Sequence, residues 1–375
     1  MNESKLFSTY ALGCFTLNHR VVMAPMTRMR SNPDDTVSDI MVAHYRQRAS
    51  AGALLIMEGA VVSSKGYAYQ GAPGLYDDRF IPGFKQIAEV VHEAGGLVFA
   101  QLYHGGRVSH HSLQPNGEAP VAPSEVPFTG HAATWEGEVV ASPARSLELI
   151  EIAGVVEEFR AAAERCMQAG FDGVELHSAN GYLLDQFLED TSNRRTDRYG
   201  GSIANRARFL LEVTDAVISV FGPGRVGIRI TPSGEFNEMG DSNPDALFGY
   251  LAARLNEYDL AWLHVVEPRI VGDHSKNGAA KLPPIAAANI RRIFKGTLIA
   301  AGGFDRESAE ALLKRGDADL IAFGRLYSAN PDLPERLRRD LPLNNYDRLT
   351  FYGGDARGCN DYPIYEDLPK PLEPE

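Results

Sequence analysis

Residues 297–325 read TLIAAGGFDRESAEALLKRGDADLIAFGR, and this stretch decides the fold. It begins and ends with short apolar runs, which are typical of strands covered on both faces. The residues between these runs have helical spacing, with an aspartate suited to the N-cap at Asp305 and a glycine suited to the C-cap at Gly316. A strand, a helix and a strand in direct succession predict parallel β/α architecture.

The same strand-then-helix pattern recurs along the whole chain. The predicted strands are the eight runs Arg20–Thr27, Ala53–Ala60, Leu97–His104, Gly173–Ala179, Val226–Pro232, Ala261–Pro268, Thr297–Gly303 and Leu320–Arg325. Longer helices are expected over Ser146–Ala169 and Ile203–Phe221, and another should start at Asn243, which precedes a proline. Eight such units fit a closed (β/α)8 TIM barrel better than a doubly wound open sheet, where about six strands are typical.

Two segments lie outside the eight units. Phe7–Asn18 is expected to form a hairpin across the bottom of the barrel. Gly105–Arg145, rich in Pro, Gly and Ser, follows the third strand and is too long for a routine connection, which predicts a functional excursion or lid. No second domain or strong internal repeat is evident, so residues 1–375 are expected to form one domain.

Composition and charge narrow the range of partners. The chain has 37 Lys and Arg against 49 Asp and Glu, and a net charge of −12 opposes attraction to nucleic acid or to anionic membranes. Small molecules are the expected partners, and either a monomer or a homodimer is compatible with the sequence. Without a signal peptide or a run of about 18 apolar residues, the protein is expected in the cytoplasm. Its three widely spaced cysteines predict free thiols.

Polar residues gather at the predicted strand ends, where barrel enzymes carry their chemistry. The residues selected by this criterion are Thr27, Gln101, His104, His177, Asn180, Arg229, His264, Glu267, the glycines of the seventh and eighth strands, and Arg325. Gly302, Gly303 and Gly324 end the strands whose turns commonly bind phosphate in barrels, and Arg325 adds a permanent positive charge. These residues predict a phosphate-bearing ligand, although the glycines could also serve only to make tight turns.

One glycine motif is misleading. Gly222 to Gly227 matches the dinucleotide-binding pattern G-x-G-x-x-G. It follows a predicted helix and precedes a strand, which is the reverse of the order that such a site requires. We therefore do not predict a dinucleotide-binding site at these glycines.

Several longer motifs resemble the old yellow enzyme family. They are Ala24-Pro-Met-Thr-Arg-Met-Arg30, Gln101-Leu-Tyr-His-Gly-Gly-Arg107, Leu176-His-Ser-Ala-Asn-Gly-Tyr-Leu-Leu-Asp-Gln-Phe187, Ser192-Asn-Arg-Arg-Thr-Asp-Arg-Tyr-Gly-Gly201, Gly227-Ile-Arg229, Phe323-Gly-Arg-Leu-Tyr-Ser-Ala-Asn-Pro-Asp332 and Phe351-Tyr-Gly-Gly354. The chain looks most like the branch with bacterial N-ethylmaleimide reductases and plant oxophytodienoate reductases. The resemblance implies an enzyme that uses FMN and NADPH or NADH to reduce the C=C bond of activated alkenes.

The resemblance also implies roles for residues around the flavin. The residues expected to line the FMN ring are Pro25, Met26, Thr27 and Ala60. Gln101 would hold the pyrimidine edge, and Arg229 would lie beside N1 and the C2 carbonyl, where its charge stabilises the anionic reduced flavin. The phosphate would be bound by the strand-end residues Gly302, Gly303, Gly324 and Arg325.

A second group of residues is implied to bind and protonate the substrate. His177 and Asn180 would donate hydrogen bonds to the substrate carbonyl oxygen, so that the β-carbon accepts hydride from flavin N5. Tyr182 would then protonate the α-carbon. Tyr352 would form part of the substrate wall. Tyr103 would face the substrate at a position where many members of the family have tryptophan.

Other enzyme classes fit the sequence less well. A metal-dependent hydrolase could use His104, His177 and His264, but the sequence lacks H-x-H and H-E-x-x-H spacings, and no metal is expected. A Schiff-base aldolase would need a lysine, and none lies in the predicted strands. A flavin-binding protein without activity is conceivable, but it would give His177, Asn180 and Tyr182 no purpose. The larger dienoyl-CoA reductases attach an iron–sulfur cluster and a nucleotide-binding domain to such a barrel, and the sequence predicts neither.

Overall fold

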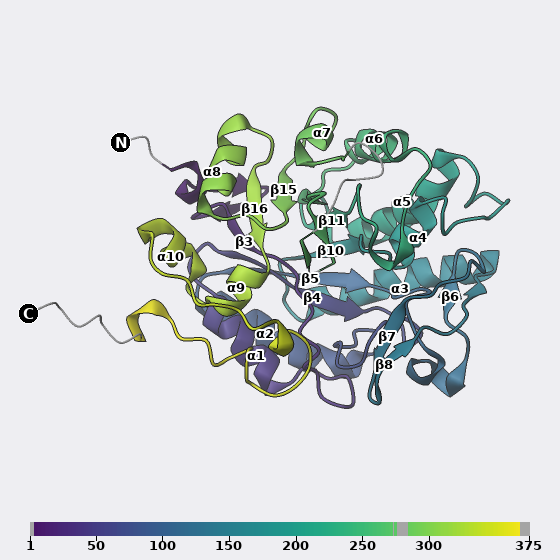
Figure 1. Ribbon diagram of the computed structural model, residues 1–375, viewed down its shortest axis with the longest axis horizontal. Helices are drawn as coiled ribbons and strands as arrows, with labels where there is room; N and C mark the ends of the chain where they lie inside the picture. The colour runs from purple at the N-terminus through teal and green to yellow at the C-terminus, as the bar shows by residue number, and fades with distance from the viewer. Residues whose placement is uncertain (1–3, 273, 276–283, 368–375) are drawn as a thin grey trace, which may run out of the picture.

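The barrel is closed by eight parallel strands. The computed structural model describes residues 4–272, 274–275 and 284–367, and Figure 1 shows the strands at the centre with helices around them. In barrel order the strands are β3 (Val21–Met23), β4 (Leu54–Val61), β5 (Leu97–Tyr103), β10 (Gly173–Ser178), β11 (Val226–Ile230), β12 (Trp262–Val266), β15 (Leu298–Ala301) and β16 (Leu320–Phe323). β16 pairs with β3 and closes the cylinder. The predicted (β/α)8 fold is therefore confirmed.

Most strands end a few residues earlier than the sequence predicted. β3, β11 and β12 stop one or more residues before Pro25, Pro232 and Pro268, respectively. Proline has no backbone N–H to continue the hydrogen-bonded ladder. The polar residues at these positions therefore lie on loops just beyond the strands.

The helices surround the barrel. They are α1 (Asp39–Arg48), α2 (Ile81–Glu93), α3 (Leu149–Gln168), α4 (Leu183–Leu188), α5 (Ile203–Phe221), α6 (Pro244–Leu255), α7 (Ala287–Arg291), α8 (Arg306–Arg315), α9 (Arg325–Ala329) and α10 (Leu333–Arg339).

The predicted starts of α6 and α8 agree with the structure, whereas the predicted start of α3 does not. α8 begins after Asp305, whose side chain accepts from Ser308 N at 2.8 Å, and ends at the left-handed Gly316. α6 starts after Asn243 as expected. α3 starts later than predicted, because Ser146 belongs to the short strand β9 (Arg145–Ser146) and Glu148 forms the capping box.

The N-terminal hairpin closes the bottom of the barrel, as predicted. Its strands β1 (Tyr10–Leu12) and β2 (Phe15–Leu17) are antiparallel. Leu12 and Leu17 are fully buried in a cluster with side chains of the barrel strands. Phe15 packs edge-on against Phe99 inside the barrel, with ring centroids 6.3 Å apart. The opposite end of the barrel is left for the ligand.

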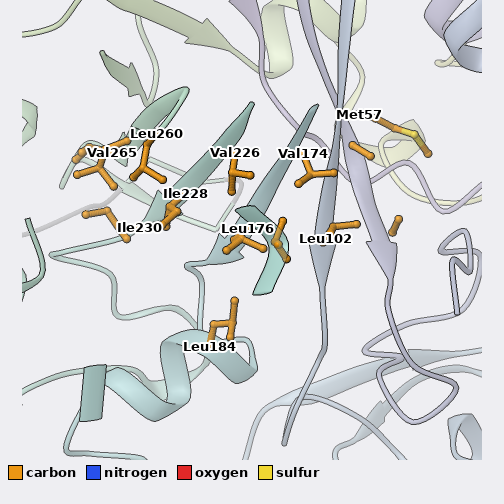
Figure 2. Packing of buried hydrophobic residues seen from close by; sticks show 14 of the residues in the cluster. Met57, Leu102, Val174, Leu176, Leu184, Val226, Ile228, Ile230, Leu260 and Val265 are labelled. Carbon is orange, nitrogen blue, oxygen red and sulfur yellow. The ribbon is translucent and has the colours of Figure 1, made fainter. Parts of the chain in front are cut away.

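The main core lies between the strands and the helices. Figure 2 shows Val174 and Leu176 of β10 beside Val226 and Ile228 of β11, with Leu184 of α4 nearby. All of these side chains are buried, and alternate residues of a strand point to opposite faces. The residues between them on β10 and β11 therefore face the interior of the barrel.

The excursion after β5 carries its own small strands. They are β6 (Val121–Ala122), β7 (His131–Thr134), β8 (Gly137–Val140) and β9. β7 and β8 form an antiparallel hairpin with the exposed Trp135 at its tip. Gln70 N donates to Ala133 O at 2.9 Å, which ties this hairpin to the loop after β4. A further antiparallel pair, β13 (Ile270–Val271) and β14 (His274–Ser275), follows β12.

The three cysteines are unpaired, as their wide spacing predicts. Cys14, Cys166 and Cys359 are free thiols, and only Cys14 is exposed. Within residues 4–272, 274–275 and 284–367, every helix is too short or too polar to cross a membrane.

The packing predicts a stability difference between two leucines. Leu251 of α6 is fully buried, whereas Leu349 is 94% exposed. Leu251→Ala should lower the free energy of unfolding by about 2–5 kcal/mol because it leaves a cavity. Leu349→Ala should change it by less than about 0.5 kcal/mol. Urea denaturation followed by circular dichroism measures both, and similar effects for the two variants would contradict the packing described here.

Candidate active site

A cavity of about 750 Å³ opens at the carboxyl ends of the strands. It is lined by residues from the loops that follow the strands and by the β7–β8 hairpin. The predicted site residues in its wall are Pro25, Met26, Thr27, Gln101, His177, Asn180, Tyr182, Arg229, Gly302, Gly303, Gly324, Arg325 and Tyr352. Segments far apart in the sequence therefore meet around one space.

Ala60 and Tyr103 lie outside this wall. Ala60 is fully buried on β4, opposite Leu102 of β5. Tyr103 is also fully buried, and its ring stacks on that of Tyr69 at 5.7 Å between centroids and 12° between planes. Tyr69 lines the cavity in front of Tyr103 and was missed from the sequence, because it lies in a loop rather than at a strand end.

The two predicted carbonyl donors are held differently. His177 lies on β10, and its buried Nδ1 has no hydrogen-bond partner among the described residues. Asn180 has a left-handed backbone with φ of 58°, which asparagine tolerates better than most residues. Asn180 N donates to Thr231 Oγ1 at 2.9 Å, and Asn237 Nδ2 donates to Asn180 O at 2.8 Å. The backbone of Asn180 is therefore fixed from both sides.

Tyr182 stands next to these donors. Its ring centroid lies 4.9 Å from that of His177, at 89° between planes. Burial raises the pKa of the Tyr182 phenol well above its usual value, helped by the nearby Tyr69. Burial and then Arg229 lower the pKa of His177 to about 3. At neutral pH the site therefore presents a protonated phenol and a neutral imidazole.

A positive charge lies at one end of the cavity. Arg229 of β11 donates from Nη1 to Pro25 O at 3.3 Å. Its buried Nε has no hydrogen-bond partner among the described residues. A guanidinium with spare donors inside a barrel is suited to an anionic or carbonyl-rich ligand.

Two guanidinium groups flank Gly303. Gly302 and Gly303 have φ of 130° and 65°, which favour glycine. A Cβ on Gly303 would lie 3.7 Å from Arg325 Nη2 and 3.9 Å from Arg269 Nε. Arg269 also donates from Nε to Gly302 O at 2.5 Å. Arg269 was missed in the sequence, although it stands just beyond the sixth strand, where a search slightly past the strand end would find it.

These groups fit FMN. The cavity offers an amide and a guanidinium at Gln101 and Arg229 for a polar ring edge, and side-chain-free glycines beside Arg325 for a phosphate, with Arg269 just outside the cavity wall. A metal site is a poorer match. Within the described ranges no group of three or more His, Cys, Asp or Glu side chains could hold a metal ion. His264 is instead paired with Glu175 at 2.9 Å.

Comparison with known proteins identifies the family. The model of the NADH:flavin oxidoreductase / NADH oxidase family matches residues 5–344. The chain belongs to this family. The resemblance to old yellow enzymes is thereby confirmed, and so are FMN as cofactor and NADH or NADPH as reductant, since both characterise this family.

Individual relatives agree with this assignment. The chain is 43% identical to 12-oxophytodienoate reductase 2 of Arabidopsis thaliana over 365 residues, 96% of each chain. It resembles morphinone reductase, solved in complex with tetrahydroNAD, at a TM-score of 0.89 and 44% identity, covering 97% of this chain and 99% of that one. It also resembles the old yellow enzyme homologue from Zymomonas mobilis, at a TM-score of 0.89 and 38% identity, covering 96% and 99% of the two chains.

The two guanidiniums predict how the flavin phosphate is bound. Arg325→Ala should weaken FMN binding about tenfold to a hundredfold, because a charged hydrogen bond contributes about 1.5–3 kcal/mol. Riboflavin, which lacks the phosphate, should bind both proteins equally. Titration of the apoprotein with each flavin, followed by flavin fluorescence, measures the difference. Arg315→Ala, at an exposed ion pair with Asp317, is the control. Equal losses for both flavins would contradict phosphate binding by Arg325.

Proposed function

We propose that this protein reduces the C=C bond of α,β-unsaturated carbonyl compounds and other activated alkenes at the expense of NADPH or NADH. The observation that carries the proposal is the convergence of His177, Asn180 and Tyr182 on the cavity that also contains Arg229. Two hydrogen-bond donors and a protonated phenol beside a flavin-binding cation are what alkene reduction needs. The names of its relatives, 12-oxophytodienoate reductase and morphinone reductase, support the same reaction class.

His177 and Asn180 bind and polarise the substrate. FMN, which Gln101, Arg229 and the strand-end glycines would hold, would supply the hydride chemistry between the nicotinamide and the alkene. The neutral imidazole of His177 and the amide of Asn180 donate hydrogen bonds to the carbonyl oxygen of the substrate. These bonds strengthen as negative charge develops on that oxygen, and they draw electron density away from the β-carbon. Thr231 and Asn237 hold the backbone from which the Asn180 amide projects, which limits the positions that this donor can take.

Tyr182 completes the addition of hydrogen. Its pKa is raised by burial, so the phenol carries its proton at neutral pH. It can donate this proton to the α-carbon once hydride has reached the β-carbon. The contact between its ring and that of His177 supports proton donation to the carbon next to the carbonyl group that His177 would bind.

The remaining site residues shape the cavity. Thr27 and Tyr69 hydrogen-bond to each other at 3.0 Å through their hydroxyl oxygens. Tyr103 supports Tyr69 and Tyr182 from behind, at 5.7 and 5.3 Å between ring centroids, so we assign its influence on the substrate to these two rings. Ala60 is assigned the same kind of indirect support beneath the flavin, and Tyr352 a direct contact with the substrate.

We propose that the excursion over residues 105–145 acts as a lid over the cavity. Its β7–β8 hairpin contributes His131, Ala132, Ala133 and Glu138 to the cavity wall. We treat residues 1–375 as one domain with this lid. A cytoplasmic location stays a prediction, and either a monomer or a homodimer is compatible with the proposal.

The proposal predicts a simple assay. Purified protein should be yellow and should release FMN on denaturation. It should oxidise NADPH or NADH faster when cyclohexenone or N-ethylmaleimide is present. An anaerobic panel of enones, nitroalkenes and quinones would then identify the preferred substrate. A colourless protein would refute the proposal, and a yellow protein inert toward the whole panel would favour a flavin-binding protein without activity.

Tyr182→Phe tests the proton donor. The substitution keeps the ring but removes the hydroxyl group, so reduction of the flavin by NADPH should keep its rate. Oxidation of the reduced enzyme by cyclohexenone should slow about a hundredfold or more, within the range for loss of a general acid. Stopped-flow absorbance measures the two half-reactions separately. Tyr67→Phe, at a buried tyrosine outside the cavity wall, is the control. Equal slowing of both half-reactions would argue against proton donation by Tyr182.

A further inference from the structure

One buried carboxylate beneath the cavity collects three hydrogen bonds. Glu175 of β10 is fully buried and is not part of the cavity wall. Gln101 Nε2 donates to Glu175 Oε1 at 2.9 Å. The other carboxylate oxygen, Oε2, accepts from Trp262 Nε1 at 2.7 Å and from His264 Nδ1 at 2.9 Å. The mechanism above gives this carboxylate no role.

The strand register explains why these side chains meet. Glu175 lies opposite Gln101 on one side and opposite Gly227 on the other. Gly227 in turn lies opposite Trp262. A Cβ on Gly227 would be 2.3 Å from the indole ring, so the missing side chain leaves room for Trp262 to reach Glu175. Gln101, Glu175, Gly227 and Trp262 thus form one layer across β5, β10, β11 and β12, and of these four only Gln101 belongs to the cavity wall.

The group contains one negative and one positive charge. Burial alone would raise the pKa of Glu175, but the hydrogen bonds from His264 and Trp262 and the charge of Arg229 hold this pKa below its ordinary value. Glu175 is therefore ionised. Burial lowers the pKa of His264, so the imidazole is neutral and donates from Nδ1. Arg229 stays a cation and is the positive charge that faces Glu175.

The ionised carboxylate also fixes the amide of Gln101. A carboxylate can only accept hydrogen bonds, so the amide must turn its NH2 group toward Glu175. Gln101 lines the cavity, and its carbonyl oxygen is the polar atom left for a ligand. The pyrimidine edge of a flavin has one donor, N3–H, between two carbonyl acceptors. An oxygen on Gln101 is matched to that donor.

We propose that Glu175 is a positioning residue of the flavin site, which holds the Gln101 oxygen toward the cavity and offsets part of the charge of Arg229, thereby lowering the reduction potential of bound FMN. The inference rests on the proposed function, because it requires FMN in the cavity. Arg229 favours the anionic reduced flavin, and a buried negative charge nearby opposes it. With Glu175 present, the reduction potential of bound FMN is lower than Arg229 alone would make it.

Glu175→Gln tests the electrostatic part. Glutamine keeps the size of the side chain but removes the negative charge. The affinity for reduced relative to oxidised FMN should rise about tenfold, which for a two-electron couple is a rise in potential of about 30 mV. Anaerobic reduction of the holoenzyme against a reference dye measures it. Glu310→Gln, at an ionised glutamate outside the cavity wall whose pKa is lowered to about 2, despite burial, by the hydrogen bonds that it accepts, is the control and should leave the potential unchanged.

Whether the reduction potential rises or falls in Glu175→Gln distinguishes the proposal from a merely structural role. A merely structural role would loosen Arg229 in the variant and lower the potential, whereas the proposal requires a rise. An unchanged or lower potential in Glu175→Gln would overturn it. If the wild-type protein holds no FMN, the proposed function fails. If the wild type holds FMN and reduces alkenes but the potential of the variant does not rise, only the role of Glu175 fails.

A second measurement needs no variant of Glu175. Wild-type apoprotein should bind FMN methylated at N3 at least about tenfold more weakly than FMN, because the Gln101 oxygen then meets a methyl group instead of N–H. Gln101→Ala should lose most of this discrimination. Equal binding of both flavins by the wild type, followed by flavin fluorescence, would overturn the assigned amide orientation.

Discussion

Closure of the barrel is the constraint on which the site depends. Each strand has one face toward the helices and one toward the interior, with a period of two residues. On β10, Val174 and Leu176 belong to the outer core, so Glu175 and His177 must face inward. A shift of one residue in register would exchange these faces and destroy core and site together. The apolar packing between strands and helices therefore also fixes the position of the functional side chains.

Buried charged side chains recur in this protein, and they are stabilised in two ways. Glu175 meets N–H donors and the cation Arg229, as described above. Beneath the mouth of the barrel, other arginines bind backbone carbonyls instead. Arg28 Nη2 donates to Gly358 O at 2.7 Å, Arg30 Nε to Asp355 O at 2.8 Å, and Arg48 Nη2 to Cys359 O at 3.0 Å. These bonds anchor the C-terminal segment.

This anchoring reaches the cavity through the backbone. Gly353 N donates to Arg28 O at 2.8 Å, directly after Tyr352 in the cavity wall. A charge-assisted bond to a carbonyl is stronger than a neutral one, and several together replace the regular secondary structure that this segment lacks. Arg28 therefore links the loop after the first barrel strand to the segment that contributes Tyr352 to the cavity wall.

Much of the fold could be predicted from the sequence because its signals are local. The apolar runs and the caps at Asp305 and Gly316 each depend on neighbouring residues. The strand ends were overestimated, since composition does not show where pairing stops. The cavity-lining residues at strand ends were also predictable. Tyr69 was not, because only tertiary packing brings its loop in front of Tyr103. Glu175 was missed because an acidic residue within an apolar strand matches neither a strand end nor a motif.

Asn180 and the excursion are both held by one irregular loop. Asn237 and Glu238 both have φ of 58°, which costs about 1–3 kcal/mol for each residue and must be stabilised by the surroundings. Arg107, from the start of the excursion, donates to the carbonyl oxygens of both, at 3.0 and 3.2 Å. The Glu238 carboxylate accepts from the backbone N–H and the hydroxyl of Thr129 in the excursion. Asn237, in the same loop, holds the backbone of Asn180. The excursion and the backbone of Asn180 are thus both hydrogen-bonded to the loop that contains Asn237 and Glu238.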